Sequence, residues 1–275
     1  MVYLWRKNML NAKNGHIKLK SFEMDYIRFG KGEKTLVMIP GVGDGLKTVK
    51  GMAAPFSVLY RSLASDFTVY VFSRRVELLP GMTTRDMAKD LNRAMKALGL
   101  SRVCLVGVSQ GGMIAQWLAI DYPDRVSRLI LAVTLSRPNP TVQEVISNWI
   151  RLAEADDYRG IMLDTAERSY TEERLRKTRK MYELLGSVGK PKSFDRFIIQ
   201  AQSCVTHDAY DELPKITCPV LVIGGTDDRI VTGKASSEIA GQIKDCRLKM
   251  YYGLGHGLYE NKDFLEQVRR FMNTD

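Results

Sequence analysis

Short apolar runs rich in Val, Ile and Leu alternate along the chain with stretches of helical periodicity. Runs of this length are typical of strands that are buried on both faces. Strands that alternate with helices predict an α/β fold, in which helices cover both faces of a mostly parallel, doubly wound sheet. The expected strands are residues 36–39, 67–72, 103–108, 129–133, 220–223 and 248–251.

The stretch between the second and third expected strands has clear helix signals. Its first residues, Thr83-Thr84-Arg85-Asp86, have the polar pattern of a capping box. Apolar residues follow at helical spacing, and Gly99 marks the end of the helix. These apolar positions are Met87, Leu91, Ala94, Met95 and Leu98.

The alternation breaks after Val133. From about Arg137 to Pro214 the pattern is helical, and Thr141-x-x-Glu144 is expected to cap the first of these helices. Residues 137–212 contain 12 basic and 13 acidic side chains, whereas the whole chain carries a net charge of +10. We therefore predict a catalytic core of residues 1–136 and 214–275, and a helical cap of residues 137–213 that lies over the strand ends.

Composition narrows the class of protein. The chain has 275 residues, of which 45% are hydrophobic and 26% charged, so it is expected to fold around a substantial core. No apolar stretch approaches the roughly 20 residues that span a bilayer. The basic N-terminal segment lacks the apolar centre of a secretory signal, so we expect a cytoplasmic protein that does not act at a membrane. Four scattered cysteines (Cys104, Cys204, Cys218 and Cys246) are expected to be free thiols rather than disulfides or zinc ligands.

The strongest chemical signal is Gly107-Val108-Ser109-Gln110-Gly111, a G-x-S-x-G motif. It follows an expected strand and precedes an apolar helix of residues 112–120. This context is typical of a nucleophile elbow, in which glycines permit a sharp turn that exposes the serine. The motif therefore predicts Ser109 as a nucleophile, with the backbone N–H of Gln110 as one donor of an oxyanion hole.

Serine needs a base, and the base needs an orienting carboxylate. Of the three histidines, His16, His207 and His256, only His256 is expected in a loop directly after a strand of the sheet. Asp227 and Asp228 follow the expected strand at 220–223, and residue reasoning alone leaves either as the acid. The order Ser, Asp, His along the chain is that of an α/β-hydrolase triad.

Together these segments resemble the α/β-hydrolase superfamily over essentially the whole chain, most closely its esterase and lactonase branch with the 3-oxoadipate enol-lactonases. The resemblance implies that Asp228, the fourth residue of Gly225-Thr-Asp-Asp228, is the acid. It also implies that Val42 supplies the second oxyanion N–H, from the loop Pro40-Gly-Val-Gly-Asp-Gly45. Relatives often have His where this chain has Pro40, so the hydrogen bond of that histidine is missing here.

Two basic segments are candidates for binding an anionic partner. Where many relatives have Asp-x-Arg-Gly-x-Gly, this chain reads Phe72-Ser-Arg-Arg-Val-Glu. Arg74 and Arg75 are candidate contacts for a substrate carboxylate, and ordinary surface arginines are the alternative. The basic run at 174–180 has no interleaved aromatic residues, which favours a solvated helix face over nucleic-acid binding. The glycine-rich loop at 40–45 lacks the spacing of a nucleotide-binding motif.

The sequence therefore predicts a serine hydrolase that cleaves a small ester or lactone, with an anionic substrate favoured by the positive charge of the core. The triad would be Ser109, Asp228 and His256, and the reaction requires no metal or organic cofactor. Three alternatives remain at this stage: a carbon–carbon bond hydrolase, an acyltransferase, and a ligand-binding receptor with negligible turnover.

Overall fold

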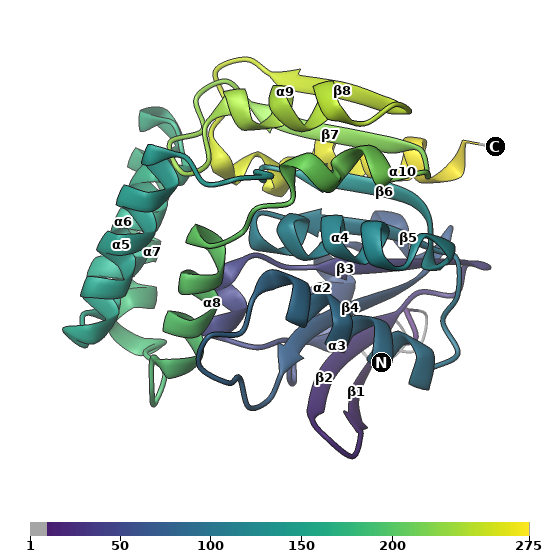
Figure 1. Ribbon diagram of the computed structural model, residues 1–275. Helices are drawn as coiled ribbons and strands as arrows, with labels where there is room; N and C mark the ends of the chain where they lie inside the picture. The colour runs from purple at the N-terminus through teal and green to yellow at the C-terminus, as the bar shows by residue number, and fades with distance from the viewer. Residues whose placement is uncertain (1–9, 275) are drawn as a thin grey trace.

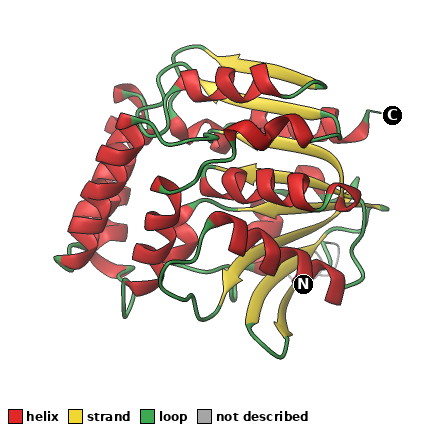
Figure 2. Ribbon diagram, in the orientation of Figure 1, coloured by secondary structure: helices red, strands yellow, loops and turns green. Residues whose placement is uncertain are grey.

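A computed structural model describes residues 10–274, so the first nine residues of the basic N-terminal segment lie outside it. Its centre is an eight-stranded sheet with helices on both faces (Figures 1 and 2). The strand order is β1-β2-β4-β3-β5-β6-β7-β8. The strands are β1 (Lys13–Lys18), β2 (Glu23–Phe29), β3 (Lys34–Ile39), β4 (Phe67–Arg75), β5 (Val103–Val108), β6 (Val126–Ala132), β7 (Val220–Gly225) and β8 (Cys246–Tyr251).

The six predicted strands are present as β3 to β8, and they pair in parallel. The predicted mostly parallel, doubly wound α/β sheet is thus confirmed. The hairpin of β1 and β2 was not predicted, and it joins β4 in antiparallel fashion at one edge. Strand β1 reads Lys-Asn-Gly-His-Ile-Lys and is mostly solvent-accessible, so it lacks the apolar run that marks the central strands.

Helices cover the two faces of the sheet in separate groups. On one face α3, α4 and α9 pack on alternate strand residues such as Leu105 and Leu131. On the other face α2 and α10 pack on the intervening residues such as Val106 and Ile130. These helices are α2 (Ala53–Leu59), α3 (Thr84–Ala97), α4 (Gln110–Asp121), α9 (Gly233–Gln242) and α10 (Lys262–Asn273), joined by the 3₁₀ helices η1 (Val42–Gly45), η2 (Arg61–Leu63), η3 (Pro123–Arg125), η4 (Tyr210–Lys215) and η5 (His256–Glu260).

The start of α3 is as predicted. The Thr83 hydroxyl accepts from the Asp86 N–H at 3.1 Å, and the Asp86 carboxylate accepts from the Thr83 N–H at 3.0 Å. This reciprocal pair is a capping box, which satisfies two N–H groups that the helix leaves free. The helix ends at Ala97, and Gly99 follows with a φ of +68°.

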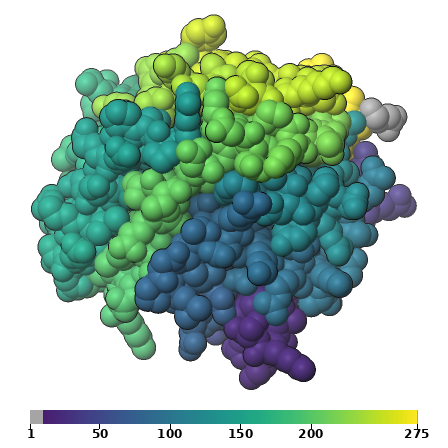
Figure 3. Space-filling view, in the orientation of Figure 1, coloured from purple at the N-terminus to yellow at the C-terminus, as the bar shows by residue number. Residues whose placement is uncertain are grey.

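Four helices lie between β6 and β7, and no strand interrupts residues 137–213. Helices α5 to α7 lie together beyond one end of the sheet, and α8 lies between them and the core (Figure 1). The space-filling view shows α8 as a green band against the blue N-terminal half of the core (Figure 3). The four are α5 (Pro140–Glu154), α6 (Tyr158–Ser169), α7 (Glu172–Val188) and α8 (Asp195–Val205).

The predicted cap of α5 at Thr141 is wrong. Asn139 is the N-cap, and its side chain accepts from the Val142 N–H at 2.9 Å. Pro140 occupies the first helical position, where its missing N–H costs nothing and its fixed φ suits the helix. The helix therefore begins one residue before Thr141, and its N-cap lies two residues before it.

Across residues 10–274, none of the helices combines the length and the apolar character needed to cross a bilayer.

Candidate active site

Ser109 stands at the turn between β5 and α4, with φ +54° and ψ −123°. Residues with a side chain rarely adopt this conformation, and such strain is concentrated at functional sites. The two glycines of the motif make the turn possible. A Cβ on Gly111 would lie 2.0 Å from the Ile39 carbonyl oxygen, and one on Gly107 would lie 2.5 Å from the Gly111 carbonyl oxygen. The local sequence therefore folds as a nucleophile elbow.

Replacing Gly111 with alanine is expected to destabilise the protein because the new methyl group meets rigid backbone. The melting temperature should fall by about 5 °C or more, as overpacking of a core typically costs 1–3 kcal/mol. Gly241→Ala is the matched control, since a Cβ at Gly241 has no atom within 4 Å. Thermal unfolding of both variants tests the expectation, and an unchanged Gly111→Ala protein would contradict this geometry.

The His256 ring is held by a buried carboxylate. Its Nδ1 lies 2.8 Å from the Asp228 Oδ2. The other oxygen, Oδ1, accepts from the N–H groups of Ile230 at 2.8 Å and Val231 at 3.0 Å. Burial opposes ionisation of Asp228, but the charge of His256 and these hydrogen bonds outweigh it and lower the pKa of the carboxyl. Asp228 is thus an ionised, fixed partner that orients the imidazole.

The neighbouring Asp227 has a different environment. It is exposed, and its carboxylate accepts from the Thr226 hydroxyl at 2.7 Å. Residue reasoning left both aspartates open, and the resemblance implied Asp228. In the structure Asp228 is the one that contacts His256.

The two other histidines lie elsewhere. His16 is on the edge strand β1, where it contacts Asp25 at 2.8 Å and Glu23 at 3.2 Å. His207 is buried near α3, with its Nδ1 2.8 Å from the Thr84 hydroxyl, and burial lowers its pKa to about 3. Neither ring lines the cavity that contains Ser109.

Ser109 and His256 line one cavity of about 360 Å³. Most of its wall is apolar, and it extends from the loop after β3 to α2 and the cap. In the described chain no hydrogen bond joins the Ser109 hydroxyl to His256, and such contacts often tighten only with substrate. Other lining residues are Met52, Phe56, Trp149, Thr165, Ser169, Ile230 and Tyr259.

The expected oxyanion donors lie at the starts of two helices beside the serine. Val42 begins η1, and Gln110 begins α4. The first N–H groups of a helix have no acceptor within it and favour negative charge. The loop that contains η1 (residues 40–47, the η1 loop) also lies directly against Ser109, since a Cβ on Gly41 would be 3.2 Å from the Ser109 Cβ. Both N–H groups are thus suited to receive an oxyanion.

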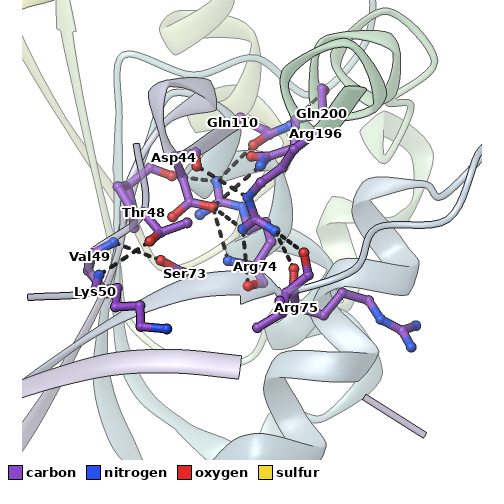
Figure 4. Close-up of polar contacts among 12 residues, drawn as sticks. Asp44, Thr48, Val49, Lys50, Ser73, Arg74, Arg75, Gln110, Arg196 and Gln200 are labelled. Atoms are coloured by element: carbon purple, nitrogen blue, oxygen red, sulfur yellow. Dashed lines mark hydrogen bonds and ion pairs between the residues drawn. The ribbon is translucent and has the colours of Figure 1, made fainter. Parts of the chain in front are cut away.

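Arg74 and Arg75 do not line this cavity, contrary to the expected contact with substrate. Adjacent strand residues point to opposite faces, and each arginine has protein partners. Arg74 is buried and donates to the Pro40 carbonyl at 2.5 Å. Arg75 donates to the Ser21 carbonyl at 2.6 Å, and its side chain extends away from the Arg74 side (Figure 4). Neither is retained as a substrate-binding residue.

Among the described residues that line the cavity, Lys47 is the one with a cationic side chain. Sequence reasoning missed it because an isolated lysine in a loop has no motif to mark it. Asp44 in the same loop also lines the cavity, and in the sequence it is marked only as part of a glycine-rich run.

Comparison with known proteins agrees with the fold. A family model described as the alpha/beta hydrolase fold matches residues 34–263. The chain belongs to the alpha/beta hydrolase fold family. It is 27% identical to a protein of Caulobacter vibrioides named as the carbamate hydrolase RutD, over 82% of this chain and 84% of that protein.

Two further likenesses concern other hydrolases. The chain is 26% identical to a 2-hydroxy-6-oxo-6-phenylhexa-2,4-dienoate hydrolase of Comamonas testosteroni, over 89% of this chain and 88% of the relative. The structure matches the crystal structure of the enol-lactonase from Burkholderia xenovorans with a TM-score of 0.80 at 20% identity, covering 94% and 100% of the two chains. At that identity the match concerns the fold. The proteins similar to this chain are thus named as hydrolases of several kinds of substrate.

Proposed function

We propose that this protein is a serine hydrolase that cleaves a small carboxylic ester or lactone through an acyl-enzyme. The proposal rests chiefly on one observation. Ser109, in the strained elbow conformation, shares a cavity with His256. The Nδ1 of His256 is held by the buried, ionised Asp228. Nucleophile, base and orienting group in that relation are the parts of acyl transfer.

In the proposed cycle the Ser109 oxygen attacks the substrate carbonyl while the Nε2 of His256 takes its proton. Asp228 holds the proton on Nδ1, so that Nε2 is free to accept, and it stabilises the imidazolium that forms. The N–H groups of Val42 and Gln110 receive the negative charge on the carbonyl oxygen. His256 then protonates the leaving group, and a water that it activates releases the acid from Ser109.

The cavity favours a small substrate. Its volume of about 360 Å³ lies at the lower end of the usual range for small-molecule sites, roughly 300–1,000 Å³. The apolar walls suit a short acyl chain or ring, and Lys47 provides a cation for a distal carboxylate. We therefore propose an anionic ester or lactone, with Lys47 in the role first expected of Arg74 or Arg75.

Lys47→Gln is expected to lower kcat/KM for a carboxylate-bearing ester by about two- to fivefold, since exposed ion pairs contribute roughly 0.2–1 kcal/mol. The pair to compare is mono-4-nitrophenyl glutarate and 4-nitrophenyl valerate, at low and high salt. The neutral ester should be unaffected, and salt should remove the difference. Lys50→Gln, which removes an exposed lysine outside the cavity lining, is the control. Equal losses on both esters would argue against a carboxylate contact.

The function itself is tested by labelling and product analysis. A fluorophosphonate probe should modify Ser109 stoichiometrically, as peptide mapping would show. Turnover should then be measured on activated esters, lactones and β-ketoacids, with product masses recorded. Labelling at Ser109 with ester or lactone turnover supports the proposal, and stoichiometric capture without turnover would indicate a receptor instead.

One relative gives a second candidate its own support. The Comamonas testosteroni protein is named for a dienoate substrate that is not an ester. The match covers most of this chain and most of that protein. A carbon–carbon bond hydrolase built on the same residues is therefore the second candidate. Cleavage of a vinylogous β-diketone acid without ester turnover would favour it. An amine among the products of a carbamate would instead favour the chemistry for which the Caulobacter relative is named.

A further inference from the structure

The two proposed oxyanion donors are both held by the same cap helix. Gln110, which provides one N–H, is fully buried, and its side-chain amide donates to the Gln200 carbonyl at 2.7 Å and the Ser203 hydroxyl at 3.0 Å. Both acceptors belong to α8. The side chain of Gln110 is thus anchored to a cap helix, by a hydrogen bond to a residue 90 positions further along the chain.

The η1 loop, which provides the other N–H, is anchored to α8 through Asp44. This carboxylate is fully buried, and its Oδ2 accepts from Arg196 at 2.7 Å and from Gln200 at 3.3 Å. The loop backbone also packs tightly on the helix, because a Cβ on Gly45 would lie 2.6 Å from the Phe197 Cα. Asp44 is two residues after Val42 in the same 3₁₀ helix. A shift of α8 would therefore move the Val42 N–H.

Arg74 links the two donors within the core (Figure 4). One nitrogen, Nη2, donates to the Gln110 Oε1 at 2.8 Å, to the Pro40 carbonyl at 2.5 Å and, at 3.4 Å, to the Gly41 carbonyl. The Gly41 carbonyl and the Val42 N–H belong to one peptide group, and a cation at the oxygen polarises the N–H toward an acceptor. Burial lowers the pKa of Arg74 to about 10, so it remains charged at neutral pH.

Arg196 completes this arrangement from the cap side. Its guanidinium donates to the Asp44 carboxylate and to the carbonyls of Arg74 at 3.1 Å and Val76 at 3.0 Å, and also to the Arg75 carbonyl. It therefore joins α8 to the end of β4 and to the η1 loop at once. Two arginines against one carboxylate leave the cluster with one net positive charge beside the site of oxyanion formation.

We propose that Arg196, acting with Asp44 and Arg74, is a positioning residue that sets the oxyanion hole from the cap. The inference rests on the proposed function and adds a residue set to it. The cluster orders the loop through the Asp44 carboxylate and the carbonyls of Pro40 and Gly41. The cap helix α8 and the oxyanion hole then move together, so substrate contacts that shift α8 change the positions of the two N–H donors.

The test compares Arg196→Met with Arg174→Met. Both substitutions remove a cap-to-core ion pair, since Arg174 on α7 pairs with Glu260 of η5. The readout is the ratio of kcat for an ester to kcat for the matching thionoester. Thiocarbonyl sulfur accepts hydrogen bonds weakly, so a well-formed oxyanion hole helps the ester far more than the thionoester.

Arg196→Met should lower kcat for the ester by about 10- to 100-fold with little change in KM, and the ester-to-thionoester ratio should fall with it. Arg174→Met should leave that ratio at the wild-type value. Arg196→Lys keeps the charge but not the fork of donors, so it should give an intermediate ratio. If Arg196→Met does not fold, Arg196→Lys carries the test alone.

The outcomes separate this inference from the proposed function. A partly unfolded or unstable Arg196→Met protein would lose activity on both substrates equally, and a constant ratio would overturn the positioning role. A fall in the ratio for Arg174→Met of the same size would overturn it as well, because any loosening of the cap would then suffice. If the wild-type protein neither labels at Ser109 nor turns over esters, the proposed function has failed instead.

Discussion

Replacing Ser109 with alanine is expected to lower kcat by about 10⁴- to 10⁶-fold, the range seen when the nucleophile of a triad is removed. The substitution deletes one oxygen at a position whose backbone is already strained with serine, so alanine should be tolerated at φ +54° to the same degree. The melting temperature should therefore stay within a few degrees of the wild type. Ester turnover and fluorophosphonate labelling are to be measured on the purified variant.

Ser237→Ala is a suitable control because Ser237 is exposed on α9, far from the elbow in sequence. It should retain full turnover and full labelling. Residual activity of Ser109→Ala at a few per cent of the wild type would mean that the cavity performs its chemistry without this hydroxyl. A mechanism in which His256 activates water directly would then have to replace the acyl-enzyme.

Local signals explain why the elbow could be predicted from sequence. The first glycine of the motif is required by a contact within the motif itself, because a Cβ on Gly107 would lie 2.5 Å from the Gly111 carbonyl oxygen. The capping box of α3 is equally local, because all of its atoms lie within four residues. The edge hairpin of β1 and β2 was missed for the opposite reason. These two strands can be identified from their pairing in the structure, and no apolar run marks them in the sequence.

Residues positioned by distant contacts could not be assigned. Arg74 looked like a substrate contact because the sequence shows charge but not direction, and its direction is set by carbonyls more than 30 residues away. Asp44 and Arg196 meet across 152 positions. Lys47 lines the cavity only because the η1 loop folds back over Ser109. The charged contacts of the site therefore depend on the fold, whereas the proposed nucleophile and base could be assigned from local sequence.

Asp228→Asn is expected to lower kcat by about 10⁴-fold, whereas Asp227→Asn should change it by less than about twofold. The geometry explains the size of the loss. The Asp228 Oδ1 accepts from two backbone N–H groups, so an asparagine would place its carbonyl oxygen there and its amide NH₂ toward His256. The Nδ1 of His256 would then have to accept, which moves the ring proton to Nε2. A protonated Nε2 cannot take the proton of Ser109.

Asp227 offers a matched comparison at the next position. Its exposed carboxylate contacts Thr226 and not the imidazole, so the amide leaves the tautomer unchanged. Steady-state kcat for the two variants, measured with the same ester, decides between them. A larger loss in Asp227→Asn would require the loop after β7 to rearrange on substrate binding, since its present hydrogen bonds direct only Asp228 toward His256. Comparable losses in both would indicate that the net charge of the loop, and not the tautomer, is what the base depends on.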